Sequence, residues 1–333
     1  MSRNIVVLAL NTVSTRSLWL AKALDGKLYL VRSRPPYVNL VQKVVNILMK
    51  EYPKKVIIQL PTGPILVATI AARALTGISA ELIADVHTGF LTSKIRFIFK
   101  GWRHNILNAP FKEFTKYVDL ILLHNKLNKV LLPREYHNKS IVLYDPFYVL
   151  KEFISKFRGC ELTYSGPRDY VVFPASWHPD EPIEFLISTW VRHGLDLPLL
   201  ITGMPRGPVT IRASKLLREN RKVVLTGYLS YDRYLCLLSK AKAVISATTS
   251  NLDMQCSAYE ALALKRPIIA SKSQAIREVL KDSASYFTIN NPTSLIKSVK
   301  EVINEYETYV GKIHRISSEL EGKIRKIIDI IMK

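Results

Sequence analysis

Cysteine, glycine and acidic side chains are all scarce in this chain of 333 residues. The 3 cysteines, Cys160, Cys236 and Cys256, lie far apart, so they indicate neither a disulfide framework nor a clustered metal site. An apolar content of 48% with only 13 glycines excludes the disordered and fibrous classes. A chain of this length most commonly forms two domains, each large enough to bury its own core.

Acidic residues are outnumbered, and the imbalance is uneven. The chain has 48 Lys and Arg against 27 Asp and Glu, a net charge of +21. Residues 1–150 hold 21 basic and 8 acidic side chains, a net charge of +13, and the densest basic stretch is 94–139. Such a surface attracts polyanions, whether nucleic acid, an anionic membrane or a phosphorylated substrate. Nucleic acid is disfavoured, because the chain lacks the aromatic and glycine marks of RNA-binding modules and any helix-turn-helix signal.

Long uninterrupted apolar runs are also missing. Residues 56–72 carry no charge, but Pro61, Gly63 and Pro64 interrupt them. This pattern predicts a strand, a turn and a helix rather than a membrane span, which needs about 20 apolar residues. Residues 4–10 follow Arg3 without a clean cleavage site, so we interpret them as a first buried strand and not as a signal peptide.

Short β-branched runs alternate with helical patterns along the whole chain. We expect strands at 4–10, 28–32, 55–60, 80–85, 119–123, 140–143, 170–174, 198–202, 222–225, 243–246, 267–270 and 285–289. We expect helices at 37–51, 65–76, 181–193, 208–219, 231–240, 255–264, 273–280 and over the stretch 292–333. Such alternation is typical of parallel sheets covered on both faces. The predicted fold class is α/β, with two doubly wound Rossmann-like domains facing a cleft and joined near 150–168.

The loops that follow the predicted strands are the candidate sites, because ligands of open α/β sheets bind beyond the carboxyl ends of the strands. Several of these loops carry unusual groupings of proline, glycine, histidine and acidic residues. They are Pro61–Pro64, Asp85–Gly89, Ala175–Glu181, Gly203–Gly207 and Thr248–Asp253.

The order of motifs in the C-terminal half resembles that of glycosyltransferases with the GT-B fold. The motifs are Ile201–Gly203, Leu225–Tyr228, Ala241–Ser246, Tyr259–Ala263, Arg266–Ser271 and Ala275–Val279. The resemblance implies an N-terminal acceptor-binding domain at 1–155 and a C-terminal domain at 168–333 that binds a nucleotide-sugar donor. The last helix is a candidate for packing back toward the N-terminal domain.

Within the wider group 1 glycosyltransferases, the finer likeness is to the chitobiosyldiphosphodolichol β-mannosyltransferase family. Four segments carry it: Val56–Phe90, Ile141–Pro146, Ala175–Glu181, and Thr249–Asp253 followed by Glu260. This resemblance implies transfer of a mannose-like sugar from a GDP- or UDP-linked donor to a lipid-linked (polyprenyl or dolichyl) sugar acceptor, with inversion. It implies a role in glycan biosynthesis such as protein glycosylation, with no cofactor and no metal.

Two departures from the retaining relatives of this family affect the donor site. Those relatives carry an Arg and a Lys after the first strand of the C-terminal domain, where this chain has Ser176 and Glu181. Their two glutamates stand eight apart, whereas Asp253 and Glu260 stand seven apart. Both changes favour inversion, but they leave the donor phosphates without their usual cations. A retaining enzyme with a UDP-sugar donor and a nonenzymatic partner subunit with a decayed donor site therefore stay open as alternatives.

Eight residues are the candidate donor-binding set: Trp177, His178, Gly203, Arg206, Ser250, Asp253, Glu260 and Glu278. Glu260 is suited to accept hydrogen bonds from a ribose diol, or it is an ordinary acid in the first turn of a helix. Asp253, with Ser250 and the amides of 251–254, would contact the sugar or diphosphate at a helix N-terminus, or it is an N-cap.

The remaining donor candidates have equally plain alternatives. Gly203 permits close backbone approach and Arg206 could pair with a diphosphate, or both belong to an ordinary turn. Trp177 and His178 would flank or stack on the base or sugar, unless the tryptophan is core. Glu278 would meet the nucleotide, or it is a solvated helix acid.

Asp85 and His87 are the candidate catalytic residues. An inverting transfer needs a base for the proton of the acceptor hydroxyl, and histidine is suited to that role. Residues at i and i+2 share a face of a strand, so Asp85 could orient His87 or serve in its place. The alternative is a structural pair that fixes the loop. We expect the other histidines His104, His124, His137 and His193 at the surface.

Aromatic and basic residues interleave over 91–116, a pattern that suits a membrane interface. Ordinary core packing would bury the same aromatics. The membrane interpretation predicts a cytoplasmic protein that binds peripherally to the anionic inner face of a membrane.

Overall fold

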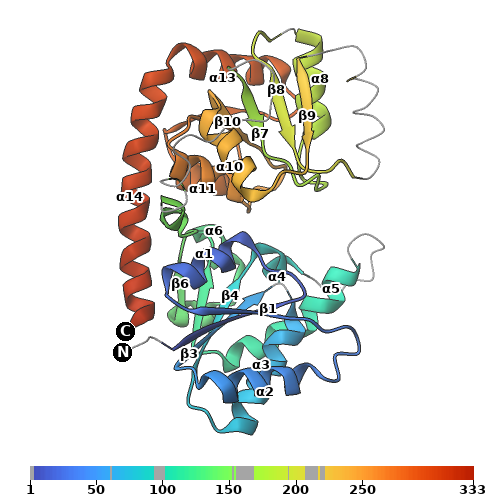
Figure 1. Ribbon diagram of the computed structural model, residues 1–333, viewed down its shortest axis with the longest axis vertical. Coiled ribbons are helices and arrows are strands. Elements are labelled where there is room, and N and C mark those ends of the chain that lie inside the picture. The colour runs from blue at the N-terminus through green and yellow to red at the C-terminus, as the bar shows by residue number, and fades with distance from the viewer. Residues whose placement is uncertain are drawn as a thin grey trace. The chain divides into compact units, whose positions relative to one another are not determined.

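The computed structural model describes residues 4–60, 62–93, 102–151, 154, 169–193, 195–206, 217 and 222–333. Two compact units divide the chain. The N-terminal unit comprises Met1–Pro146 and Lys323–Lys333, and the C-terminal unit comprises Phe147–Gly322. Each unit is built on its own parallel sheet with helices packed against it (Figure 1).

The sheet of the N-terminal unit has six parallel strands within the described residues. They are β1 (Ile5–Leu10), β2 (Lys27–Val31), β3 (Lys55–Leu60), β4 (Glu81–Val86), β5 (Leu120–Leu123) and β6 (Ser140–Val142). Across the sheet their order is β2-β1-β3-β4-β5-β6, so the winding reverses between β1 and β3. Every residue of β1 is buried, as expected for an interior parallel strand that is covered on both faces.

The helices of this unit begin and end at residues that suit those positions. They are α1 (Thr15–Ala23), α2 (Leu40–Glu51), α3 (Gly63–Thr76), α4 (Thr88–Thr92), α5 (Trp102–Asn108) and α6 (Lys126–Leu131), with 3-10 helices η1 (Ala109–Tyr117) and η2 (Arg134–Lys139). The Ser14 side chain caps α1 by accepting from the Ser17 amide. Helix α3 has Pro64 in its first turn and ends at Gly77, and it packs beside α2 (Figure 1).

The C-terminal unit repeats this architecture. Its described strands are β7 (Val171–Phe173), β8 (Leu199–Thr202), β9 (Val223–Gly227), β10 (Ala243–Ser246), β11 (Ile268–Ser271) and β12 (Ala284–Phe287). Their order is β12-β11-β10-β7-β8-β9, so the winding reverses between β7 and β10. Ligands of doubly wound sheets bind at such reversals, which makes the loops after these two strands the first place to look for a site.

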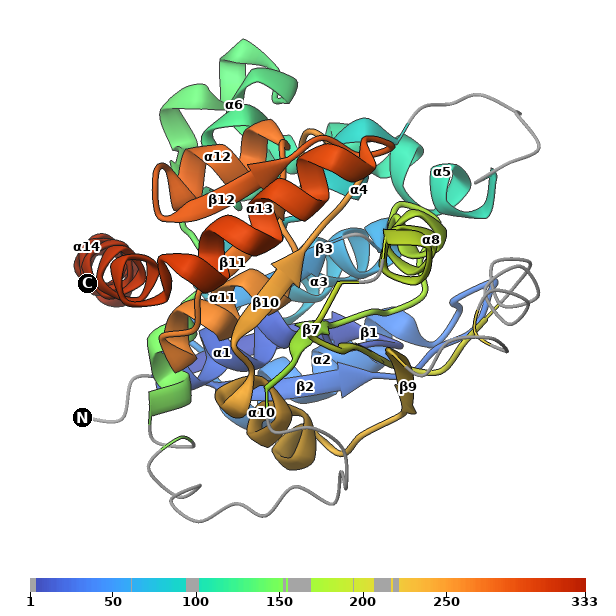
Figure 2. The ribbon, with the colours of Figure 1, turned by 90° about the horizontal axis from the view of Figure 1, so that it is seen from above.

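The helical elements of this unit are η3 (Phe147–Leu150), α8 (Ile183–His193), α10 (Tyr231–Lys240), α11 (Cys256–Leu264), α12 (Gln274–Leu280), α13 (Pro292–Asn304) and most of α14 (Tyr306–Met332). The residues of α14 from Lys323 onward belong to the N-terminal unit. Helix α13 lies along β12 (Figure 2). Although cysteines are few, Cys236 of α10 is disulfide-bonded, whereas Cys256 forms no disulfide.

The two doubly wound sheets confirm the predicted fold class. Each strand of the described residues lies within two residues of its predicted position, and the charge-free stretch 56–72 forms β3 and α3 as expected. The stretch 292–333 is two helices and not one, because the chain leaves helical geometry at Glu305. The predicted helix at 208–219 falls almost wholly outside the described residues. In the described part of the chain, no helix is both long and apolar enough to cross a bilayer.

Part of the aromatic stretch 91–116 belongs to the core. Phe111 and Phe114 pack against the buried cluster of the N-terminal unit. A Cβ atom on Gly63 would lie 2.4 Å from the Phe111 ring, so the ring and the start of α3 are in close contact. These two aromatics fit the core-packing alternative, and the membrane interpretation of the stretch stays a prediction. Ile106 is 47% exposed, and residues 94–101 lie outside the described residues.

Gly203 is required by the contact between the loops that follow β7 and β8. Its φ is +82°, and a Cβ atom there would lie 2.2 Å from the carbonyl oxygen of Ala175. Its amide donates to the carbonyl of Gly227 at 3.0 Å. The close approach expected of this glycine is therefore made to the backbone of the protein itself.

Replacing Gly203 with alanine should destabilise the C-terminal unit more than replacing Gly227. Gly227 also has a positive φ, +70°, but its nearest atom is the Met204 sulfur at 4.0 Å. Gly227→Ala should cost only the backbone term of about 1–2 kcal/mol, whereas Gly203→Ala adds a clash with a carbonyl. Urea unfolding of both variants measures the difference. Equal losses would show that the approach to Ala175 constrains nothing.

Candidate functional site

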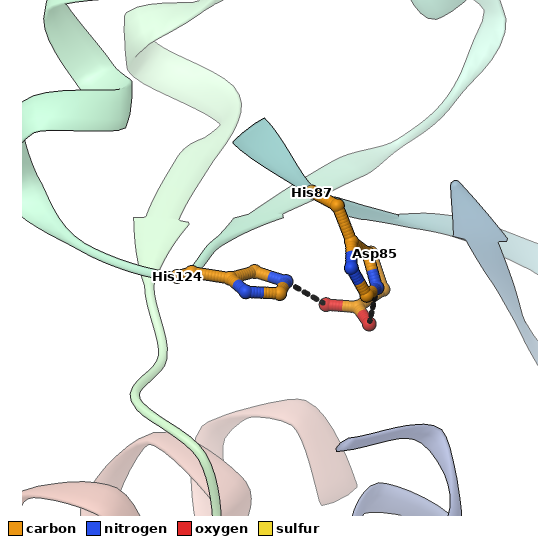
Figure 3. A group of neighbouring side chains, drawn as sticks. All are labelled: Asp85, His87 and His124. Atoms are coloured by element: carbon orange, nitrogen blue, oxygen red, sulfur yellow. Dashed lines mark ion pairs between the residues drawn. The ribbon is translucent and has the colours of Figure 1, made fainter. Parts of the chain in front are cut away.

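A cluster of three side chains lies at the carboxyl ends of β4 and β5 (Figure 3). Asp85 is the penultimate residue of β4, His87 follows that strand, and His124 follows β5, which pairs with β4. The Nε2 atom of His87 is 3.7 Å from Oδ2 of Asp85, and Nε2 of His124 is 3.7 Å from Oδ1. The two imidazole rings lie 4.3 Å apart, with an angle of 58° between their planes.

The expected pairing of Asp85 with His87 is present, but the expectation that His124 lies at the surface is wrong. Its side chain is only 22% exposed, because it follows a strand adjacent to β4 and turns toward Asp85. The rule that sites follow strand ends would have found it. Of the other histidines, His193 is exposed, and His137 is half-buried against the carbonyl of Leu132; the His104 side chain lies outside the described residues.

A buried arginine anchors this cluster. Nε of Arg16, on α1, donates to Oδ1 of Asp85 at 2.8 Å, and Nη1 donates to Oδ1 of Asp145 at 2.6 Å. The Arg16 side chain is 1% exposed, and those of Asp85 and Asp145 are 1% and 5% exposed. Charges this deeply buried are tolerated when they are paired and hydrogen-bonded. The sequence pattern did not identify Arg16. Its one distinguishing feature there is that it is a charged residue in the helix after the first strand, where several apolar residues accompany it.

The charges of the cluster fix its protonation. Burial by itself disfavours the charged forms, but Asp85 and Asp145 together raise the pKa of Arg16 above its ordinary value. Burial alone would raise the pKa of Asp85, but the charge of Arg16 outweighs burial and holds this pKa well below its usual range. Burial, and then the charge of Arg16, lower the pKa of His124 well below that of a free histidine. Asp85 is therefore an ionised carboxylate, and His124 is a neutral imidazole.

Several polar atoms of this cluster are buried without a hydrogen-bond partner. Across the residues that the structure describes, these atoms are Nη2 of Arg16, Oδ2 of Asp85, Nε2 of His87 and Nε2 of His124. A buried polar atom left unsatisfied costs about 1–3 kcal/mol. Such atoms are uncommon in native proteins, and several together indicate a site that is completed by something else.

Glu181 organises the loop after β7 in the C-terminal unit. Its carboxylate accepts from the backbone amides of Ser176 and His178 and from the Ser176 hydroxyl, at 2.8–3.1 Å. It also accepts from the side-chain amide of Gln255 at 3.3 Å. Ser176 and Glu181 stand at the two positions where the retaining relatives are expected to carry cations. In this chain the two residues are hydrogen-bonded to each other. The amides of Ser176 and His178 are already engaged.

Further hydrogen bonds join this loop to the loop after β10. The Thr248 hydroxyl donates to Asp180 at 2.9 Å, and the Ser250 hydroxyl donates to Asp253 at 2.6 Å. The structure therefore brings the predicted pair Ser250 and Asp253 together at the reversal of the sheet. Asp253 is not a helix cap, because the N-cap of α11 is Gln255. The Leu252 amide already donates to the Ser250 oxygen, which removes one of the amides that we expected to be open to phosphate.

Glu260 is in the middle of α11 and is 4% exposed. Its carboxylate accepts from the hydroxyls of Tyr231, at 3.2 Å, and Tyr234, both on α10. Burial and the charge of Glu260 raise the pKa of Tyr234 well above its ordinary value, so this tyrosine stays a neutral donor. Both carboxylate oxygens already accept a hydrogen bond, and a ribose diol would have to share them. Ribose binding by Glu260 stays a prediction.

The other donor candidates lie in different environments. Trp177 is core: it is 6% exposed, and its indole N–H donates to the Thr202 carbonyl at 3.0 Å. This packing leaves little ring for the predicted stacking. His178 is exposed and is hydrogen-bonded to Asp180, and Arg206 is exposed after β8. Glu278 is half-buried on α12. Gly207 lies outside the described residues.

Similar solved structures place both units in the GT-B fold. HepE from Anabaena, in complex with UDP and glucose, has a TM-score of 0.70 at 12% identity over 99% of each chain. The lipopolysaccharide outer core galactosyltransferase WaaB, in its apo form, has a TM-score of 0.62 at 13% identity over 99% of this chain and 100% of its own. The UDP-GlcNAc 2-epimerase from Neisseria meningitidis bound to UDP-GlcNAc has a TM-score of 0.64 at 13% identity over 98% and 99%. At these identities the likeness shows the fold alone.

A family of known proteins matches part of the chain. Residues 168–305 match the family described as "Glycosyl transferases group 1". The matched segment lies within the C-terminal unit and contains β7–β12 with their loops. No curated protein matches the chain. The finer resemblance to the chitobiosyldiphosphodolichol β-mannosyltransferase family stays a prediction.

Arg16→Met should destabilise the N-terminal unit by about 3–5 kcal/mol, because it removes the buried cation that pairs with Asp85 and Asp145. The matched control is Arg73→Met, since Arg73 pairs with Asp119 in the same unit while the two side chains are 29% and 49% exposed. That pair should contribute about 0–1 kcal/mol. Urea unfolding at neutral pH compares the two variants. Similar losses would show that the Arg16 ion pairs do not support the cluster.

Proposed function

We propose that the protein is a glycosyltransferase that takes its sugar from a nucleotide diphosphate donor. The observation that carries the proposal is the group 1 match over 168–305, which contains the loops after β7 and β10 where polar side chains gather. A GT-B fold alone would not suffice, since a UDP-GlcNAc 2-epimerase shares it. The structure of HepE with UDP-glucose supports a UDP-linked donor, whereas the β-mannosyltransferase resemblance supports a GDP-linked one.

The C-terminal unit is the proposed donor side. Ser250 and Asp253 are proposed to contact sugar hydroxyls, and their position at the reversal between β7 and β10 supports this role. Glu260 is proposed to accept from the ribose in addition to its tyrosines. Because Glu181 stands where a cation would be expected, neutralisation of the diphosphate is proposed to depend, among the described residues of these loops, on Arg206 and on backbone amides. A donor site with so few positively charged side chains is also what a decayed, nonenzymatic subunit would have. Binding of the donor nucleotide therefore has to be measured.

His87 is the proposed catalytic base, and Asp85 orients it. Asp85 is already bound by Arg16, which makes it a poor proton acceptor. The Oδ2 atom of Asp85 faces Nε2 of His87. The other ring nitrogen, Nδ1, is therefore the one proposed to take the proton from the hydroxyl group of the acceptor sugar. As the acceptor oxygen bonds to the anomeric carbon, the bond from that carbon to the diphosphate breaks. The nucleoside diphosphate leaves, and the acceptor proton passes to His87, with inversion.

A lipid-linked sugar acceptor at a membrane surface is the proposed second substrate. The net charge of +21, with +13 in residues 1–150, supports attraction to a diphosphate-linked acceptor and to anionic lipid. We further propose that the transferred sugar is mannose-like. The protein is proposed to bind peripherally to the cytoplasmic face of a membrane. A retaining mechanism with a UDP-sugar stays the alternative for the stereochemistry.

Substitutions in the two units should separate donor binding from turnover. Glu260→Gln should weaken binding of the preferred nucleotide, GDP or UDP, in isothermal titration. His87→Ala should leave that affinity nearly unchanged and slow transfer by about 10²–10⁴-fold, the usual contribution of a general base. His193→Ala, at an exposed histidine, is the control and should keep the full rate. Binding of neither nucleotide would favour the nonenzymatic alternative, and full activity of His87→Ala would reject the base assignment.

The protein should float with vesicles that contain anionic lipid at low salt and should be released at high salt. Each basic side chain near such a surface contributes about 1 kcal/mol, and salt screens this attraction. Vesicles of neutral lipid provide the control. No flotation with anionic vesicles at low salt would remove the membrane-bound part of the proposal.

A further inference from the structure

Three potential metal ligands converge on one enclosed point in the N-terminal unit. Oδ2 of Asp85, Nε2 of His87 and Nε2 of His124 are all buried, and none has a hydrogen-bond partner among the described residues. The ligand atoms of these three residues lie within 4.8 Å of one another. Each can offer a lone pair, and Figure 3 shows both rings directed at the carboxylate. Three buried polar atoms without hydrogen-bond partners, each of a type that ligates metals, describe a candidate site for a cation.

The charge balance of the cluster also favours a cation. The one guanidinium of Arg16 is shared between the carboxylates of Asp85 and Asp145, and the ionised Asp85 still has an unpaired oxygen, Oδ2, that a cation would neutralise. Arg16 binds the other oxygen of Asp85, at 2.8 Å, and so fixes the carboxylate with Oδ2 facing His87. A hydrogen-bonded partner of this kind is what orients ligands in metal sites.

The donor set selects the kind of ion. Two imidazole nitrogens and one carboxylate suit zinc and its first-row neighbours, whereas magnesium and calcium prefer oxygen ligands. In a tetrahedral zinc site with bonds of about 2.0–2.2 Å, the ligand atoms are about 3.4 Å apart. The 3.7 Å between His87 Nε2 and Asp85 Oδ2 is close to this spacing. Three protein ligands leave a fourth position open.

We propose that Asp85, His87 and His124 form a binding site for one divalent transition-metal ion, with Zn²⁺ as the preferred ion. If the proposed function holds, this ion inhibits transfer. A neutral imidazole carries a single N–H, so zinc on Nε2 of His87 places the proton on Nδ1. Nδ1 is the atom that the proposed mechanism needs free. Zinc binding and base catalysis by His87 therefore exclude each other.

Direct binding tests the site without reference to activity. The full chain, treated with EDTA and dialysed, should bind one Zn²⁺ in isothermal titration, and Co²⁺ should give the visible absorption of a tetrahedral complex. His87→Gln and His124→Gln should each lower zinc affinity by at least about 100-fold, more than the loss of an outer-shell partner causes. His193→Gln and Cys256→Ser, which remove potential ligands elsewhere, should bind zinc as the unmodified chain does.

Circular dichroism and a thermal unfolding scan of each metal-free variant establish that it is folded. The three-ligand site is rejected if the unmodified chain binds no zinc at micromolar concentrations, or if either histidine variant keeps the affinity of the unmodified chain. In the latter case the bound metal lies elsewhere.

Activity gives a second, separable measurement. Zinc should inhibit transfer, EDTA should reverse the inhibition, and His124→Gln should need at least about 100-fold more zinc for half-inhibition, whatever its rate without zinc. Zinc binding without any transferase activity would reject the proposed function and leave the metal site standing. Transfer that saturating zinc does not slow would reject the inhibitory role.

Discussion

The N-terminal unit depends on one buried interaction, the contact of Arg16 with Asp85 and Asp145. It draws together α1, the end of β4 and the segment after β6, elements that are distant in the sequence. A guanidinium can donate to two carboxylates at once, and a lysine could not reproduce that geometry. Because Arg16 keeps Asp85 ionised and fixes one of its oxygens, the other oxygen is held in front of His87. Both the proposed proton transfer and the proposed zinc site follow from that placement.

The C-terminal unit is organised by carboxylates that satisfy backbone and side-chain donors of their own loops. Glu181 holds the loop after β7, Asp180 accepts from Thr248 after β10, and Glu260 is held by two tyrosines. This internal pairing stabilises the loops at the reversal of the sheet, but among the described residues of these loops it leaves few donors for a diphosphate. The group 1 match and the scarcity of cations in these described loops are therefore in tension, and the affinity for a nucleotide decides whether the proposed donor site is functional.

The fold was predictable because apolar β-branched runs and helical periodicity agree along nearly the whole chain. Parts of the site were predictable for the same reason, since Asp85, His87, Ser250 and Asp253 follow strand ends. Arg16 was not found, because its role arises from burial and from contacts between distant segments, which no local pattern records. His124 was missed although it directly follows a predicted strand, because its charged surroundings favoured the surface. Trp177 and Gly203 were found as special positions, but their packing serves the loops themselves. Local sequence indicates where a site lies and reveals much less about which partners its polar atoms have.

The central claim is that Asp85, held by Arg16, fixes the proton of His87 on Nε2 and leaves Nδ1 free. Nitrogen-15 NMR of the histidine rings in the metal-free full chain, with His87→Ala to assign the signals, measures this placement directly. We predict that the single proton of the neutral His87 ring is on Nε2, the nitrogen that faces Asp85. A ring protonated on Nδ1 would contradict it, because Asp85 would then not be orienting the base.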